Sequence, residues 1–219
     1  MQQHIDHFPK GEMRDIYLLA INHCIFKMNK GSDQFLREGF ELYQSGLQNE
    51  LLLENGFLSP FTYKNVAIIG LKLKEFAWVE NYLEQYKKYL RPDTRDNIYT
   101  YNLAHYYFRT DNFSEAMKLL QQTDFEDILH NLDARRMLLR MYFELEEYEA
   151  LESLLESFTT FIRRKKIGYH GENYLNLIKF TRRLLALPHF DKKGKRALIE
   201  QIKTEENLAE KSWLLAQLE

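Results

Sequence analysis

The sequence predicts an all-α protein in which antiparallel helices are joined by short polar turns. Apolar residues recur at spacings of three and four through most of the chain, which is the period of an amphipathic helix. No stretch alternates between apolar and polar residues for long enough to indicate a strand. Only four prolines and nine glycines occur in 219 residues, which argues against a loop-rich structure. We therefore expect about ten helices in one continuous array.

The segment from Asn97 to Thr123 contains the clearest pair of predicted helices. The apolar face of the first helix consists of Leu103, Ala104, Tyr107 and Phe108. A polar turn follows at Thr110-Asp111-Asn112, and the apolar face of the second helix consists of Phe113, Ala116 and Leu120. Because Ala104 and Ala116 are small, the axes of the two helices can approach each other closely.

Two other segments repeat this arrangement. The upstream copy has Val66, Ala67 and Gly70 before a Lys74-Glu75 turn, and the downstream copy has Leu138, Leu139 and Tyr142 before a Glu146-Glu147 turn. An aromatic residue follows each turn, and these residues, 37 and 35 positions apart, are Phe76, Phe113 and Tyr148. Together the three predicted hairpins cover residues 61–163. The alternative is chance self-similarity, which long helical chains always show to some degree.

The repeated pattern resembles the signature of the tetratricopeptide repeat (TPR), a helix hairpin with small residues at the crossing and an aromatic residue after the turn. The resemblance implies a right-handed TPR-like α-solenoid whose first helices line a concave groove for a peptide or a partner helix. Val79 and Leu151 stand where the family usually has a small residue, so we expect the outer two hairpins to be splayed or shifted. The runs 131–139 and 149–155 also resemble uncharacterised bacterial helical-repeat proteins, which implies no activity.

The chain divides into four predicted segments. Residues 1–10 form an irregular N-terminus, residues 11–58 an irregular first hairpin with a linker, residues 59–166 the three TPR-like hairpins, and residues 167–219 the C-terminal capping helices. The linker, residues 51–58, is expected to contain a short helical turn. Ser59 and Pro60 mark the next helix start, because a hydroxyl caps free amides and proline suits the first turn.

The predicted binding surface consists of the positions on the first helices that do not face the predicted core. These positions are Lys64, Asn65, Ile68, Tyr101, Asn102, His105, Arg109, Arg136 and Arg140. Amides suit the backbone of a bound peptide, aromatic rings suit its side chains and cations suit its acidic groups. Asn65 and Asn102 also resemble part of the TPR clamp for a C-terminal carboxylate, although the basic residues of that clamp are incomplete here. An ordinary solvated helix face is the alternative.

A second candidate surface is electrostatic. Residues 163–196 contain eleven lysines and arginines against two acidic residues, whereas residues 124–162 contain ten acidic residues against three arginines. The candidate cations of this basic block are Arg163, Arg164, Lys165, Lys166, Arg182, Arg183, Lys192 and Lys193. Such a block can bind nucleic acid or another anionic surface through counterion release. The alternative is that the two blocks neutralise each other within the chain.

Composition and motifs favour a binding protein over an enzyme. The sequence has no glycine-rich phosphate loop, no paired-histidine zinc helix and no Cys-x-x-Cys, so we expect no catalytic residue, metal or cofactor. His4, Asp6 and His7 are expected to be solvated rather than metal ligands. The single cysteine, Cys24, and the lack of a signal peptide or a long apolar run indicate a cytoplasmic protein without a membrane span. With a net charge of −2, a protein or peptide is the expected partner and nucleic acid the less favoured one.

Overall fold

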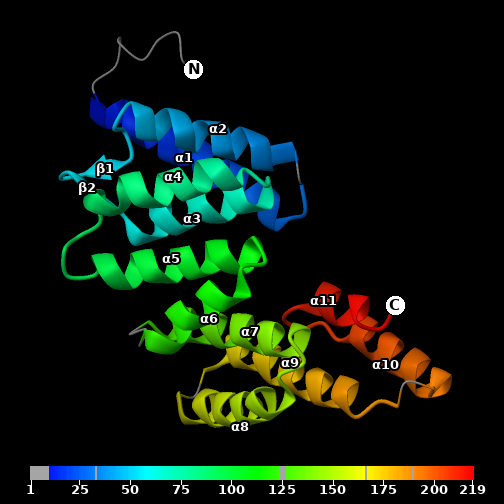
Figure 1. Ribbon diagram of the computed structural model, residues 1–219. Helices are drawn as coiled ribbons and strands as arrows, with labels where there is room; N and C mark the ends of the chain where they lie inside the picture. The colour runs from blue at the N-terminus through cyan, green and yellow to red at the C-terminus, as the bar shows by residue number, and fades with distance from the viewer. Residues whose placement is uncertain (1–9, 33, 124–126, 166, 189) are drawn as a thin grey trace. The chain divides into compact units, whose positions relative to one another are not determined.

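The computed structural model describes residues 10–32, 34–123, 127–165, 167–188 and 190–219, and 77% of these residues are helical (Figure 1). The prediction of an all-α chain is therefore confirmed at the level of fold class. The chain forms two compact units, Met1–Phe125 and Glu126–Glu219. The boundary between them falls between the second and third predicted hairpins.

The first unit consists of three helix pairs and a short connecting hairpin (Figure 1). Its elements are α1 (Lys10–Asn29), α2 (Gln34–Gln48), β1 (Leu53–Glu54), β2 (Phe57–Leu58), α3 (Pro60–Lys72), α4 (Phe76–Tyr86), the 3-10 helix η2 (Lys87–Tyr89), α5 (Arg95–Arg109) and α6 (Phe113–Gln122). α1 packs on α2, α3 on α4 and α5 on α6. α3 also contacts α2 and α5, so each pair packs on the next within this unit.

Buried tyrosines tie α3 to α4 in the core of the first unit. Tyr63 is 0% exposed and Tyr82 is 2% exposed, and their ring centroids lie 5.3 Å apart. The Tyr63 hydroxyl donates a 2.6 Å hydrogen bond to the carbonyl oxygen of Leu83, and the Tyr82 hydroxyl donates one of 3.3 Å to the carbonyl oxygen of Tyr63. Because a buried hydroxyl needs a partner, these bonds fix the two helices in one register.

The second unit has five α-helices among its described residues. They are α7 (Ile128–Glu144), α8 (Tyr148–Lys165), α9 (Tyr169–Leu185), α10 (Lys192–Thr204) and α11 (Lys211–Ala216). α7 packs on α8 and α8 on α9, and α9 contacts both α10 and α11. Two aspartates cap helix starts here, since Asp127 accepts a hydrogen bond from the amide of His130 and Asp191 accepts one from the amide of Gly194.

The three predicted hairpins share one turn geometry. Lys74, Asp111 and Glu146 have left-handed backbone conformations, with φ of 60°, 58° and 57°. The amide of the next residue bonds back to a carbonyl five positions earlier in each case, at 3.0, 2.9 and 2.9 Å. This bonding pattern ends a helix and reverses the chain. These turns lie 37 and 35 residues apart. The same geometry also follows α2, where Glu50 has φ of 57° and the amide of Leu51 bonds to the carbonyl oxygen of Gly46 at 2.9 Å.

The small residue of the α3–α4 hairpin lies on α3, at Gly70, and not at position 79 on α4 where the family pattern would place it. Val79 is 0% exposed, as are Ala116 and Leu151 at the matching positions of the other hairpins. A Cβ atom on Gly70 would lie only 2.5 Å from Cγ2 of Val79. Gly70 thus supplies on α3 the space that Val79 takes up on α4.

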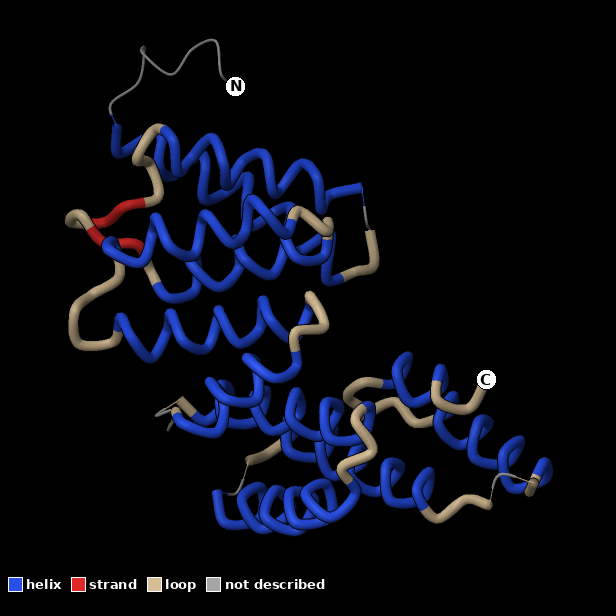
Figure 2. The backbone as a smooth tube through the Cα atoms, in the orientation of Figure 1, coloured by secondary structure: helices blue, strands red, loops and turns tan. Residues whose placement is uncertain are grey.

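Two details differ from the sequence predictions. The linker 51–58 forms a two-stranded antiparallel hairpin instead of a helical turn, with Leu53 opposite Leu58 (Figure 2). Asn55 and Gly56 have φ of 52° and 79°, as a tight hairpin turn requires. Phe113, which the sequence places on the apolar face of its helix, is also only half-buried, and Tyr148 after the next turn is 48% exposed.

Candidate functional site

α5 buries two residues that the sequence assigned to the binding surface. Tyr101 is 1% exposed and Asn102 is 2% exposed, so the prediction that they form an open patch is wrong. The physical reason is that α5 packs against α3, α4 and α6 within the first unit. The Asn102 carboxamide donates a 2.8 Å hydrogen bond to the carbonyl oxygen of Ile98 in its own helix. Both residues belong to the core of the first unit.

The other groove candidates of the first unit keep some exposure. Lys64, Asn65, Ile68 and His105 are half-buried and Arg109 is exposed. The Lys64 ammonium lies 5.2 Å from the centroid of the Tyr101 ring, a cation–π contact between α3 and α5. Lys64 therefore connects α3 with α5.

The two groove candidates of the second unit bind a carboxylate of the chain itself. Arg136 and Arg140 both form ion pairs with Glu210, which precedes α11, and Arg136 also pairs with Asp133 at 2.7 Å. The side chain of Glu210 is 16% exposed and that of Arg136 is 13% exposed. Burial alone would lower the pKa of Arg136, but Asp133 and Glu210 outweigh burial and raise that pKa above its ordinary value. The acidic group that these cations were predicted to bind is thus supplied within the unit.

The basic block separates into clusters at the two ends of α9. Arg163, Arg164 and Lys165 are exposed in the last turn of α8, just before α9 begins, and Arg182 and Arg183 lie at its far end. Seventeen residues of α9 span about 25 Å, so the clusters do not form one continuous surface. Arg182 pairs with Glu152 at 3.7 Å, and Arg183 donates a hydrogen bond to Gln201. The exposed Lys192 and Lys193 begin α10.

One part of the basic block borders a pocket of about 520 Å³ between α7 and α8. Arg135, Arg164 and Lys165 line it together with Ser157, Thr160 and Phe161. The Arg135 guanidinium lies 4.8 Å from the centroid of the Phe161 ring, which holds the cation at the pocket wall. The hydroxyls of Ser157 and Thr160 donate to carbonyls of their own helix, so they offer only acceptor positions in this geometry.

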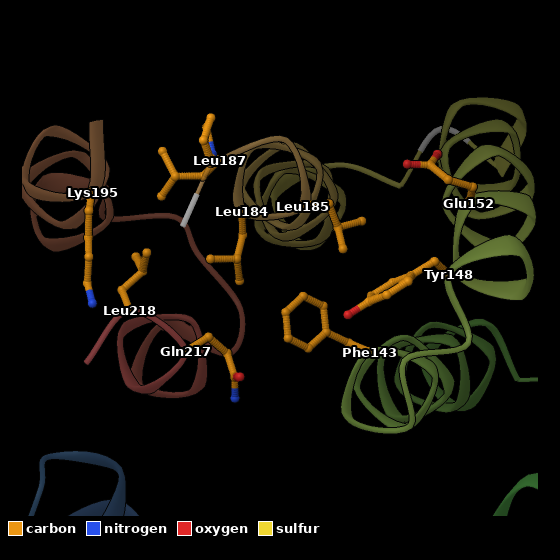
Figure 3. Close-up of a pocket in the computed structure, with 10 residues that line it drawn as sticks. Phe143, Tyr148, Glu152, Leu184, Leu185, Leu187, Lys195, Gln217 and Leu218 are labelled. Atoms are coloured by element: carbon orange, nitrogen blue, oxygen red, sulfur yellow. The ribbon is translucent and has the colours of Figure 1, made fainter. Parts of the chain in front are cut away.

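The larger cleft of the second unit was not predicted from the sequence. It has a volume of about 600 Å³ and is lined by Phe143, Tyr148, Glu152, Leu184, Leu185, Leu187, Pro188, Lys195, Gln217 and Leu218 (Figure 3). Figure 3 shows apolar side chains from α7, α9 and the C-terminal residues around the space, with Lys195 of α10 on one side and Glu152 of α8 on the other. The lining comes from five parts of the chain, and no local spacing in the sequence brings them together.

Specific contacts hold one wall of the cleft, formed by α11 and the end of α7, in place. The indole Nε1 of Trp213 donates a 2.6 Å hydrogen bond to Oε1 of Glu144, and Nε2 of Gln217 donates one of 3.3 Å to the same oxygen. The rings of Phe143 and Trp213 meet edge to face with centroids 5.2 Å apart. α11 is thereby fixed against the end of α7, so this wall of the cleft is pre-formed.

The aromatic ring at the mouth of the cleft is accessible. Tyr148 is 48% exposed, and it is the first residue of α8, directly after the left-handed turn at Glu146. Leu145, which precedes that turn, is 43% exposed but does not line the cleft. The cleft can therefore bind an amphipathic segment. It combines an apolar lining with an accessible aromatic ring and has one charge of each sign at its edges.

Among the described residues, no group of three or more His, Cys, Asp or Glu side chains is placed to hold a metal ion. His4, Asp6, His7 and Lys166 lie outside those residues, so the predictions for them stay predictions. No helix in the described ranges combines the length and the apolar character needed to cross a membrane. Comparisons with protein-family models, with curated proteins and with solved structures find no match for this chain.

Proposed function

We propose that this chain is a protein-interaction module, a right-handed TPR-like α-solenoid that binds a segment of a partner protein. The main support is the 600 Å³ cleft of the second unit, in which apolar side chains surround an open space. This volume lies within the range of roughly 300–1,000 Å³ that is typical of ligand sites. The shared turn geometry at Lys74, Asp111 and Glu146 supports the repeat architecture.

The chemistry of the cleft indicates the kind of segment that it binds. Leu184, Leu185 and Leu187 on one wall and Phe143 and Tyr148 on the other favour an apolar stretch of the partner. Because Lys195 and Glu152 lie on opposite sides of the space, an acidic residue toward α10 and a basic residue toward α8 would complete it (Figure 3). Glu152 already forms an ion pair with Arg182 at 3.7 Å, whereas the Lys195 ammonium donates a 3.4 Å hydrogen bond to the backbone oxygen of Glu219. Because this bond is long and leaves two ammonium protons for another acceptor, Lys195 is the stronger determinant of orientation.

The accessible ring of Tyr148 is the expected energetic centre of this interaction. Aromatic residues dominate binding energy because they bury a large area at a small cost in conformational entropy. Truncating such a residue typically costs about 2 kcal/mol or more, which is roughly a 30-fold loss of affinity. The proposal therefore makes Tyr148→Ala the most informative single substitution.

The test compares Tyr148→Ala with Leu145→Ala, a matched control that removes a similarly exposed apolar side chain outside the cleft. The full chain is used to capture partners from the native cell, and the partners are identified by mass spectrometry. The part of the partner that binds is then mapped and prepared as a synthetic segment. Isothermal titration calorimetry then measures its affinity for each variant. We expect Tyr148→Ala to lose about 30-fold and Leu145→Ala to keep its affinity.

A charge reversal sharpens the test. The Lys195→Glu variant should bind the wild-type segment more weakly than the unmodified chain does. If the acidic residue of the segment is changed to lysine, the Lys195→Glu variant should bind this altered segment with restored affinity. Equal affinity of the wild-type segment for the unmodified chain, Tyr148→Ala and Lys195→Glu would show that the cleft is not the binding site.

Binding of an anionic surface or nucleic acid is a second candidate function, supported by the 520 Å³ pocket at Arg135, Arg164 and Lys165. Phosphate contacts would give a steep dependence of affinity on salt concentration. A salt titration with single-stranded RNA, repeated with Arg164→Glu and Lys165→Glu, tests it. An unchanged salt slope in these variants would remove this function.

A cytoplasmic location and the absence of catalysis belong to the same proposal. Both rest on sequence observations, namely the single cysteine and the lack of catalytic motifs. Fractionation of the native cell tests the location directly.

A further inference from the structure

A separate groove of about 430 Å³ lies in the first unit between α2 and α4. Its most accessible lining consists of four carboxamide side chains and two aromatic rings, which are Gln44, Gln48, Asn81, Gln85, Trp78 and Tyr86. None of the described side chains that line it carries a charge. The groove therefore differs in chemistry from the cleft of the second unit, and it fits a neutral polar ligand.

The carboxamides of this groove have unused hydrogen-bonding capacity. Those of Gln44, Gln48 and Gln85 make no hydrogen bond with any other described residue of the chain, and neither does the indole N–H of Trp78. Asn81 donates one 3.0 Å hydrogen bond to the carbonyl oxygen of Ala77, which leaves its oxygen as an acceptor. Each carboxamide offers both donors and an acceptor, which is the combination that a peptide backbone requires.

A row of aromatic rings in mutual contact makes the base of the groove rigid. The Trp78 ring lies parallel to that of Tyr82, with centroids 5.2 Å apart and an interplanar angle of 8°. Phe40 of α2 meets Trp78 edge to face at 4.8 Å, and Tyr82 is followed by Tyr86 at 5.1 Å. Because Phe40 and Tyr82 are buried, the indole has little freedom to rotate. The groove is therefore pre-organised, which reduces the entropy cost of binding.

The spacing of the carboxamides matches an extended polypeptide. Gln44 and Gln48 are four residues apart on α2, and Asn81 and Gln85 are four residues apart on α4, so each pair is separated by about 6 Å along its helix. In an extended chain, main-chain groups that point in the same direction recur every second residue, about 6.6 Å apart. Flexible glutamine side chains can absorb this small difference.

We propose that this groove binds an extended, uncharged segment of a partner polypeptide through its main chain. The carboxamides of α2 and α4 bond to N–H and C=O groups of alternate residues, and Trp78 and Tyr86 contact the intervening side chains. This site is independent of the proposed cleft, because it lies in the other unit and uses none of the same residues.

Trp78 provides a direct reporter for the test. The chain has two tryptophans, so the Trp213→Phe variant leaves Trp78 as the only one. Uncharged decapeptides are selected from a displayed library with the full chain, synthesised, and titrated while Trp78 fluorescence is recorded. We expect a saturable change in fluorescence, and an affinity at least tenfold lower for Gln48→Ala with Gln85→Ala. The matched control is Gln34→Ala with Gln122→Ala, which removes two exposed carboxamides outside the groove.

Backbone methylation separates main-chain recognition from side-chain recognition. N-methyl groups on every second residue remove donors without changing side chains, so one register should abolish binding while the other is tolerated. Three outcomes would each overturn the proposal. The selection could yield no peptide, the selected peptides could bind the double variant Gln48→Ala with Gln85→Ala as tightly as the unmodified chain, or the two methylated registers could be tolerated equally. A Trp78 response to cellobiose or N,N′-diacetylchitobiose without a response to any peptide would instead assign the groove to carbohydrate. Tyr148→Ala should leave this binding unchanged, so its outcome is separate from that of the cleft.

Discussion

The close approach of α3 and α4 at Gly70 offers the sharpest test of the packing. A Cβ atom at this position would lie 2.5 Å from Cγ2 of Val79 and 3.1 Å from Cε2 of Phe40. Val79 is 0% exposed and Phe40 is 1% exposed, so neither side chain can move into solvent. Gly70→Ala should therefore force the two helices apart, or push both side chains out of their preferred rotamers.

The expected change follows from two opposing terms. Overpacking costs about 1–3 kcal/mol, and two simultaneous contacts favour the upper half of this range. Alanine in place of glycine inside a helix stabilises the helix by about 1 kcal/mol. The free energy of unfolding should therefore fall by about 1–2 kcal/mol in Gly70→Ala. Val79→Ala alone removes two buried methyl groups and should cost about 2 kcal/mol. In the double variant the contact with Val79 disappears and only the milder contact with Phe40 remains. The loss in the double variant should therefore be smaller than the sum of the two single losses by about 1–2 kcal/mol.

Urea unfolding of the first unit measures these values. In the Trp213→Phe background, Trp78 fluorescence follows this unit alone, which matters because a chain with two units need not unfold in one step. The control is Gly11→Ala in α1, where a Cβ atom would meet nothing within 4 Å. If Gly70→Ala is no less stable than Gly11→Ala and the double variant is additive, the helices are not in close contact at this point.

Three further predictions follow from burial. Glu210→Ala should destabilise the second unit by about 1–3 kcal/mol, because it removes the carboxylate that two half-buried arginines share. The exposed Glu206→Ala should change little, so equal thermal midpoints of the two variants would contradict this. Tyr101→Ala should cost about 3–5 kcal/mol in urea unfolding of the first unit, and a loss below about 1 kcal/mol would indicate a surface residue. Burial raises the pKa of Tyr43 to about 12, so the stability this neutral hydroxyl contributes below pH 10 should be lost as the pH rises from about 10 toward 12. Tyr43→Phe should reduce that alkaline loss, measured by urea midpoints at pH 9 and 11.5, and a loss as large as that of the unmodified chain would contradict this.

Local features of the fold could be predicted because they depend on neighbouring residues. Ser59 accepts a 3.0 Å hydrogen bond from the amide of Thr62 at the start of α3, as its position before Pro60 predicts. The turns after α3, α5 and α7 occur where polar residues interrupt the apolar period. The hairpin at 53–58 was not predicted although its signal was present, since an Asn-Gly pair such as Asn55-Gly56 is a strong sign of a tight two-residue turn.

The pairing of Val79 with Gly70 shows a limit of reading one helix at a time. The family pattern places the small residue on the second helix, and its absence at Val79 suggested a splayed hairpin. A helix crossing needs space, and that space can come from either helix. Gly70, nine positions earlier, provides it.

The sequence by itself determined the helices, their turns and the period of the hairpins, because these follow from hydrogen bonds and side-chain spacing within a few residues. Tertiary structure decided which helix faces remain open. Tyr101 and Asn102 are buried because three other helices cover α5, and Arg136 and Arg140 are paired because Glu210, about seventy residues later, reaches α7. The lining of the cleft at Tyr148 likewise comes from helices that are distant in sequence. Periodicity identifies an apolar face, but the packing of every neighbouring helix determines which polar positions stay exposed.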